Sequence, residues 1–136
     1  MKKSQLKCTD RTKLEDFVLY PDTVSNVDRL CAKGFVIIVI TNQPDVGNGI
    51  VPESVINQMH IYLKNTISLD NIQVCFDTRN QKNSRLKPSP YMLLNAAREM
   101  DIDIGISYVI GDRAGDILAG QAAGCPHNIF IDRLYS

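Results

Sequence analysis

Two carboxylates four residues apart are the first feature of the sequence that could do chemistry. Asp112 and Asp116 follow an apolar segment at residues 108–111 and precede an Ala- and Gly-rich segment at residues 117–124. If the apolar segment is a buried parallel strand, both acids reach the carboxyl edge of a sheet, where open α/β sheets place their chemistry. There they could hold a hard cation or orient a lysine. The alternative is a loop whose acidic side chains cap the next helix.

A second polar group follows another apolar segment. Residues 35–40 are apolar and mostly β-branched, which is typical of a parallel strand buried on both faces. Thr41 and Asn42 come directly after them, and their hydroxyl and amide groups suit the oxygens of a phosphate. A turn held by local hydrogen bonds between side chains and backbone is the alternative.

A lysine stands just before the next predicted helix. Lys87 precedes Pro88, and a residue before proline favours an extended backbone. That backbone would bring the ammonium group to the same sheet edge as the acids. The alternative is a lysine that is simply solvated.

The elements that must position these side chains alternate between strand and helix. Apolar segments predict strands at residues 35–40, 72–76, 108–111 and 128–131. Helical spacing of apolar residues predicts helices between Asp22, a candidate N-cap, and Gly34, and at residues 52–67, 88–100 and 117–124. Alternation of this kind indicates an α/β fold with a parallel sheet.

Composition sets further bounds. The chain has 136 residues, enough for one domain, which we place at residues 14–136 after a polar segment at residues 1–13 (a weak strand or a tail). Its formal net charge is zero, which argues against nucleic acid as a partner. Four scattered cysteines indicate reduced thiols, and no apolar run is long enough to span a membrane. We therefore expect a cytoplasmic protein.

Four motifs in order resemble the haloacid dehalogenase-like phosphatase superfamily, and most closely its heptose 1,7-bisphosphate and histidinol-phosphate phosphatases. The likeness extends from about Leu14 to Ile131. It rests on the segments at residues 19–22, 34–43, 87–92 and 111–124. The resemblance implies a three-layer, Rossmann-like α/β sandwich with a mainly parallel sheet and no separate cap domain.

The resemblance also implies a role for each polar residue. Thr41 would bind the transferring phosphoryl group, and Asn42 would line the substrate side. Lys87 would neutralise phosphate charge, Asp112 would bind Mg²⁺, and Asp116 would orient the lysine. Phosphoryl transfer depends mostly on positioning and charge neutralisation, so a cation, an ammonium group and a hydroxyl donor are the expected parts.

The family's nucleophile motif, Asp-x-Asp after an apolar first strand, has no clear counterpart here. The candidate is Asp10, which would serve as nucleophile and second metal ligand, with Thr12 in place of the general acid. The strand before it would have to come from residues 5–9, or else a partner chain must supply one. Without either, backbone groups in the centre of the sheet would remain unpaired, at about 1–3 kcal/mol each.

The zinc loop found in many members of this branch is also altered. Cys75 occupies the first ligand position, but Asp77, Asn83 and Arg85 stand at the others. One thiolate does not complete a tetrahedral site, so we predict no zinc. Arg85 lies near the position of an arginine that the family has beside the motif lysine, and the resemblance makes it a candidate for substrate binding.

Two functions follow from these features. The first is a Mg²⁺-dependent phosphatase, monomeric or dimeric, that acts on a small phosphorylated metabolite through an aspartyl-phosphate intermediate. The second is a degenerate relative that keeps the phosphate and Mg²⁺ pocket as a binding or regulatory module, or a fragment that needs a partner.

Overall fold

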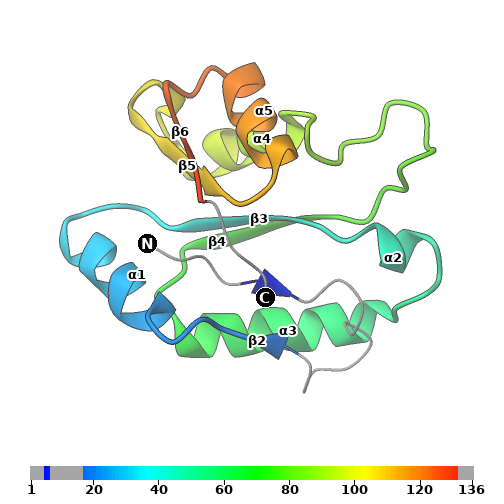
Figure 1. Ribbon diagram of the computed structural model, residues 1–136, viewed down its shortest axis with the longest axis horizontal. Helices are drawn as coiled ribbons and strands as arrows, with labels where there is room; N and C mark the ends of the chain where they lie inside the picture. The colour runs from blue at the N-terminus through cyan, green and yellow to red at the C-terminus, as the bar shows by residue number, and fades with distance from the viewer. Residues whose placement is uncertain (1–4, 7–16, 132–136) are drawn as a thin grey trace. The chain divides into compact units, whose positions relative to one another are not determined.

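The computed structural model describes residues 5–6 and 17–131, and strands and helices alternate along the chain (Figure 1). The elements are β1 (Gln5–Leu6), β2 (Phe17–Val18), α1 (Thr23–Ala32), β3 (Ile38–Asn42), α2 (Pro44–Gly47), α3 (Glu53–Thr66), β4 (Asn71–Cys75), α4 (Tyr91–Met100), the 3₁₀-helix η2 (Ile104–Ile106), β5 (Tyr108–Gly111), α5 (Ala114–Ala123) and β6 (His127–Phe130). The chain divides into two compact units, one with Met1–Val39 and Asp45–Ile72, the other with Ile40–Pro44 and Gln73–Ser136.

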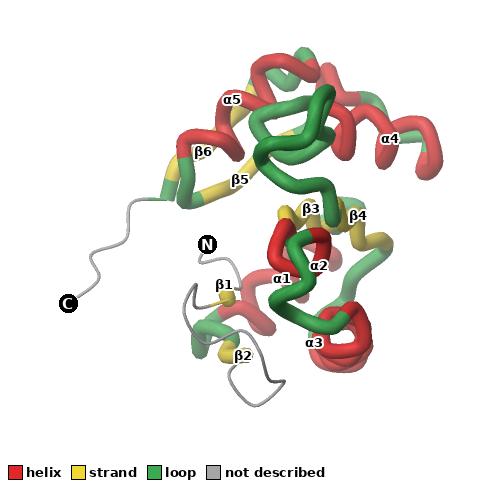
Figure 2. The backbone as a smooth tube through the Cα atoms, turned by 90° about the vertical axis from the view of Figure 1, so that its right-hand side faces the viewer, coloured by secondary structure: helices red, strands yellow, loops and turns green. Residues whose placement is uncertain are grey.

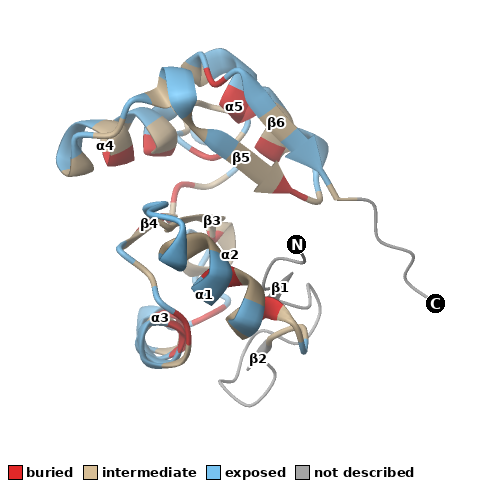
Figure 3. Cartoon of the chain, turned by 90° about the vertical axis from the view of Figure 1, so that its left-hand side faces the viewer, coloured by how far each residue is buried: buried red, intermediate tan, exposed pale blue. Residues whose placement is uncertain are grey.

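The first unit has an apolar core between its two longer helices. Val27 of α1, Leu63 of α3 and Ile67 form a buried cluster. Apolar residues recur along α3 at helical spacing, so the buried residues lie on one side of the helix (Figure 3). The helix predicted at residues 52–67 is therefore confirmed as α3.

The start of α1 differs in detail from the prediction. Asp22 stands at the N-cap position, but its side chain makes no capping hydrogen bond. Its Oδ1 atom is buried without a partner among the described residues, and the hydroxyl of Thr23 is in the same situation. At the other end, α1 stops at Ala32, and Gly34, two residues later, has a φ of +91°, a conformation that glycine adopts without strain. The predicted end of the helix just before Gly34 is confirmed.

Strand β3 lies further along the chain than the apolar pattern predicts. Phe35 and Val36 are exposed, and the strand begins only at Ile38. Its entry is fixed by Asp70, whose carboxylate accepts a hydrogen bond from the Ile37 backbone N–H at 2.7 Å and whose own N–H donates to the Ile37 carbonyl at 2.9 Å. Thr41 and Asn42 thus lie within the strand instead of after it.

Residues 5–6 form a short strand, but among the described residues it does not pair with β3 or β5, so the prediction that residues 5–9 supply the central strand of the sheet stays a prediction. This strand, β1, pairs with β2 in antiparallel orientation, Gln5 opposite Val18 and Leu6 opposite Phe17. In the described part of the chain, β3 pairs with β4 and β5 with β6, in two further two-stranded sheets. Asp10 and the predicted boundary after residue 13 lie outside the described residues, and a strand from a partner chain stays a prediction.

The second unit contains a parallel strand pair covered by a helix. β5 and β6 pair in parallel, with Tyr108 opposite His127 and Gly111 opposite Phe130. The rings of Tyr108 and His127 stack with centroids 4.5 Å apart. Helix α5 packs against both strands (Figure 2). It begins at Ala114, three residues earlier than predicted, so Asp116 lies in its first turn.

A second apolar cluster lies next to the predicted lysine. Cys75, Leu86 and Met92 are buried together, with Ile40 packed against them. Within the described ranges, no helix has the length and apolar character needed to cross a membrane.

Candidate functional site

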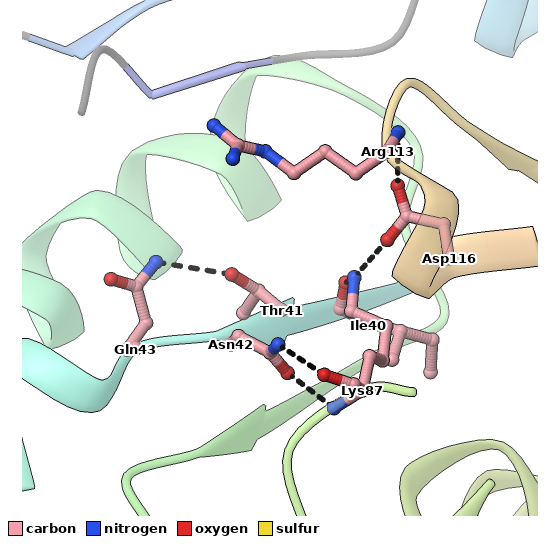
Figure 4. A network of polar contacts seen from close by, with 7 residues as sticks. All are labelled: Ile40, Thr41, Asn42, Gln43, Lys87, Arg113 and Asp116. Atoms are coloured by element: carbon pink, nitrogen blue, oxygen red, sulfur yellow. Dashed lines mark hydrogen bonds and ion pairs between the residues drawn. The ribbon is translucent and has the colours of Figure 1, made fainter. Parts of the chain in front are cut away.

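The Lys87 ammonium group lies at the centre of a polar network in the second unit (Figure 4). Its Nζ donates hydrogen bonds to Oδ1 of Asp116 at 2.6 Å and to the carbonyl of Ile40 at 3.0 Å. The Lys87 and Asp116 side chains are only 11% and 7% exposed. An ion pair withdrawn from water in this way is stable only with good geometry and further hydrogen bonds, which the Ile40 carbonyl helps to supply.

Asn42 holds the backbone of the lysine. Its Oδ1 accepts a hydrogen bond from the Lys87 N–H at 2.9 Å, and its Nδ2 donates to the Lys87 carbonyl at 3.2 Å. These bonds join residues 45 positions apart, so the alternative of a turn with local bonds is wrong for Asn42. The Asn42 amide thus fixes the position of the Lys87 backbone. The predicted role of Asn42 toward substrate stays a prediction.

Gln43, which sequence reasoning did not select, holds the hydroxyl of Thr41. Gln43 is buried, its backbone N–H donates to the Cys75 carbonyl at 2.8 Å, and its Nε2 donates to Thr41 Oγ1 at 3.0 Å. A hydroxyl oxygen that accepts from an amide keeps its own O–H available as a donor. The Thr41 hydroxyl can therefore donate to an anionic oxygen.

Both predicted uses of Asp116 occur together. While Oδ1 binds Lys87, Oδ2 accepts a hydrogen bond from the backbone N–H of Arg113 at 3.2 Å and so caps α5. Gly111 leaves the space for this carboxylate, because a Cβ at residue 111 would lie 2.3 Å from Cβ and Oδ2 of Asp116. The Arg113 side chain extends from the start of α5, and nothing in the sequence pattern distinguished it (Figure 4).

Asp112 directly follows β5 and is partly exposed. Mg²⁺ is commonly bound by one or two carboxylates, with water and substrate phosphates as its other ligands. Asp112 offers one such carboxylate, so the donor chemistry fits. In the described ranges, no group of three or more His, Cys, Asp or Glu side chains could hold a metal ion. A Mg²⁺ ion at Asp112 would therefore need ligands from substrate, water or residues outside those ranges, such as Asp10.

Arg85 is bound to Asp77, a partner that sequence reasoning missed. Asp77 accepts three hydrogen bonds from Arg85: from the backbone N–H at 2.8 Å, from Nε at 2.8 Å and from Nη2 at 2.7 Å. These bonds hold the pKa of Asp77 well below its usual range and raise that of Arg85. The guanidinium also lies 5.4 Å from the centre of the Tyr91 ring. The predicted absence of zinc and the predicted substrate role of Arg85 stay predictions.

Known proteins resemble the chain over most of its length. A protein of Rhodopseudomonas palustris, named D-glycero-beta-D-manno-heptose-1,7-bisphosphate 7-phosphatase, is 29% identical over 118 residues, which are 78% of this chain and 66% of that protein. A D-glycero-alpha-D-manno-heptose-1,7-bisphosphate 7-phosphatase of Burkholderia mallei is 29% identical over 87% of this chain and 69% of its own length. The chain thus spans about two thirds of the length of these relatives.

The fold is also shared with solved structures. The D,D-heptose 1,7-bisphosphate phosphatase of B. bronchiseptica, solved with magnesium and phosphate, superposes with a TM-score of 0.80 at 23% identity, covering 90% of this chain and 71% of that one. This likeness confirms the predicted Rossmann-like α/β fold. The sequence model of the haloacid dehalogenase-like hydrolases matches residues 7–124. The chain therefore belongs to the haloacid dehalogenase-like hydrolase family.

Proposed function

We propose that the chain is a Mg²⁺-dependent phosphatase that hydrolyses a small phosphorylated metabolite, with a heptose bisphosphate or a similar sugar phosphate as substrate. The observation that carries this proposal is the buried Lys87–Asp116 pair beside the Thr41 hydroxyl. An ammonium group and a hydroxyl donor at one strand end are suited to the oxygens of a transferring phosphoryl group. The names of the two relatives support a heptose bisphosphate as the substrate class.

Each polar group has a part in this reaction. Thr41 donates its O–H to a phosphoryl oxygen, and the Lys87 ammonium neutralises charge on the same group. Asp112, together with Asp10, would hold Mg²⁺, and the bound ion would supply further positive charge at the phosphate. The Asp10 carboxylate attacks phosphorus, and the P–O bond to the substrate breaks as the alkoxide leaves and takes up a proton from water. A second water molecule then cleaves the acyl phosphate, which releases inorganic phosphate and restores the Asp10 carboxylate.

The partners follow from the same chemistry. The substrate is a small metabolite, and neither nucleic acid nor a membrane is a partner in this proposal; fifteen acidic residues offset fifteen lysines and arginines, which argues against nucleic acid. The protein acts in the cytoplasm as a monomer or dimer. Arg85, with a half-exposed guanidinium, is the candidate to contact the distal part of the substrate.

Phosphate release from a panel of sugar phosphates with Mg²⁺ tests the proposal. Lys87→Met and Asp112→Asn should each lower kcat by roughly 10²-fold or more, because each removes charge that stabilises the transition state. Asp10→Asn should abolish turnover. EDTA should stop the parent reaction, and added Mg²⁺ should restore it.

The matched control is Asp101→Asn. Asp101 is exposed and has a φ of +53°, a conformation that asparagine also tolerates, so its activity should equal that of the parent. Full activity in both Lys87→Met and Asp112→Asn would refute the proposal. A parent that binds phosphate but releases none from any ester would instead be a binding module.

A further inference from the structure

The segment before Lys87 begins and ends at one ion pair. Asp77 lies two residues after β4, and Arg85 lies two residues before the lysine. All three hydrogen bonds from Arg85 converge on one carboxylate, so both the backbone and the guanidinium of residue 85 are held. We call this pair the Asp77–Arg85 clasp. A paired fork of N–H donors on a carboxylate fixes orientation as well as distance.

Three consecutive residues are then anchored in three different ways. Arg85 is held by the clasp, Leu86 is buried in the cluster with Cys75 and Met92, and the backbone of Lys87 is held by Asn42. The chain therefore approaches the lysine along a fixed path. The clasp joins Asp77, two residues after β4, to Arg85 by hydrogen bonds, while Leu86 packs against Cys75, the last residue of β4.

The clasp acts through geometry more than through stability. The Arg85 side chain is 52% exposed while that of Asp77 is 7% exposed, and solvent weakens the attraction of such a pair. The pKa of Asp77 is lowered by its hydrogen bonds with Arg85. A carboxyl group whose pKa is lowered by folding contributes stability that is complete above its unfolded pKa of about 3.9 and is lost as the pH falls further. The clasp is therefore intact at neutral pH.

We propose that Asp77 and Arg85 are positioning residues for Lys87. Their ion pair holds the loop in the shape that places the lysine for phosphoryl transfer, and the loop needs no bound metal to keep that shape. The catalytic half of this inference rests on the proposed phosphatase function. The structural half does not, because it concerns only how firmly the ammonium group is held against Asp116 and Ile40.

Kinetics of Asp77→Ala and Arg85→Lys test the catalytic half. A misplacement of about 1 Å can cost up to roughly 10²-fold in rate, so Asp77→Ala should lower kcat by about 10- to 100-fold. Arg85→Lys keeps the charge but not the fork of donors and should fall between this variant and the parent. The control, Arg79→Met, removes an exposed cation from the same segment and should leave kcat unchanged.

A double-mutant cycle separates positioning from general structural damage. If Asp77 acts through Lys87, then Asp77→Ala should have little further effect on kcat in a Lys87→Met background. Equal losses in both backgrounds would overturn the inference. Asp77→Asn retains size and one acceptor oxygen, and it replaces Asp77→Ala in the cycle if the alanine variant does not fold.

Chemical labelling of lysine amines, read at Lys87 by mass spectrometry, tests the structural half without any need for turnover. In the parent, the paired and mostly buried ammonium should react slowly. In Asp77→Ala its labelling rate should rise several-fold, while Arg79→Met should match the parent. An unchanged rate in Asp77→Ala would refute the inference. A parent without activity would refute the phosphatase proposal, and the labelling result would still decide this one.

Discussion

At the scale of single residues, the site depends on one missing side chain. Gly111 and Asp116 lie so close that no Cβ fits at residue 111 unless the carboxylate moves. The same carboxylate binds Lys87 and caps α5, so its displacement would affect the charge at the site and the start of the helix together.

We therefore expect Gly111→Ala to lower the free energy of unfolding by about 1–3 kcal/mol, the usual cost of overpacking. It should also lower kcat at least tenfold, because Asp116 can no longer hold Lys87. The measurements are urea unfolding and phosphate release.

Gly115→Ala is the matched control. A Cβ there would meet nothing nearer than the Lys87 and Pro88 backbone at 3.8 Å, and alanine is favoured over glycine in a helix by up to about 1 kcal/mol. If Gly111→Ala and Gly115→Ala behave alike, the close packing of Asp116 on residue 111 does not matter for the site.

Some of these roles could be predicted from the residues alone. Thr41 and Asp116 stand near the ends of apolar segments, and Lys87 precedes a proline; these positions predict a shared sheet edge. The role of Asp77 could not be predicted in this way, because its partner lies eight residues further on in an irregular segment. The role of Gln43 was also missed. Its hydrogen bond to Thr41 depends on the burial of the Gln43 side chain, which the sequence does not show.

At the scale of elements, hydrophobic periodicity predicts helices better than strand ends. On α3 the buried and exposed residues follow the helical repeat. On β3 the strand start depends on the hydrogen bonds between Ile37 and Asp70, which no local pattern reveals. The last residue of β3 is Asn42, and its side chain is hydrogen-bonded to the backbone of Lys87, a residue far away in the sequence.

Helix α3 offers a direct test of which face is buried. Ile56 is 1% exposed and Ile61 is 60% exposed, so the two isoleucines of one helix differ mainly in burial. Ile56→Ala should cost about 2–5 kcal/mol of unfolding free energy, and Ile61→Ala less than about 0.5 kcal/mol. Urea unfolding with an unchanged m-value measures both. Equal losses would mean that α3 does not bury the face seen here.

At the scale of the whole molecule, ligand binding should raise stability by mass action. A ligand present at one hundred times its dissociation constant stabilises the folded protein by about 2.7 kcal/mol. Inorganic phosphate together with Mg²⁺ should therefore raise the melting temperature of the parent. Asp112→Asn should lose the part of the rise that depends on Mg²⁺, and Asp101→Asn should keep it. No rise at saturating phosphate would contradict a phosphate site.

The chain as a whole shows what sequence can and cannot specify. Alternation of strand and helix was enough for the fold class, which the similarity in fold to a solved phosphatase confirms. The N-terminal segment was not predictable in the same way, because its lysines and polar residues provide no clear period.

The segment between Asp77 and Arg85 is a loop whose two ends are joined by hydrogen bonds. Because the clasp lies next to Lys87, a change in the number of residues in the loop should not change the position of the lysine. Closing a longer flexible segment costs little extra entropy, and exposed loop tips tolerate insertion well. Residues 78–84 are thus a place where natural variation in length, or a peptide epitope grafted by design, can be accommodated without disturbing the chemistry beside it.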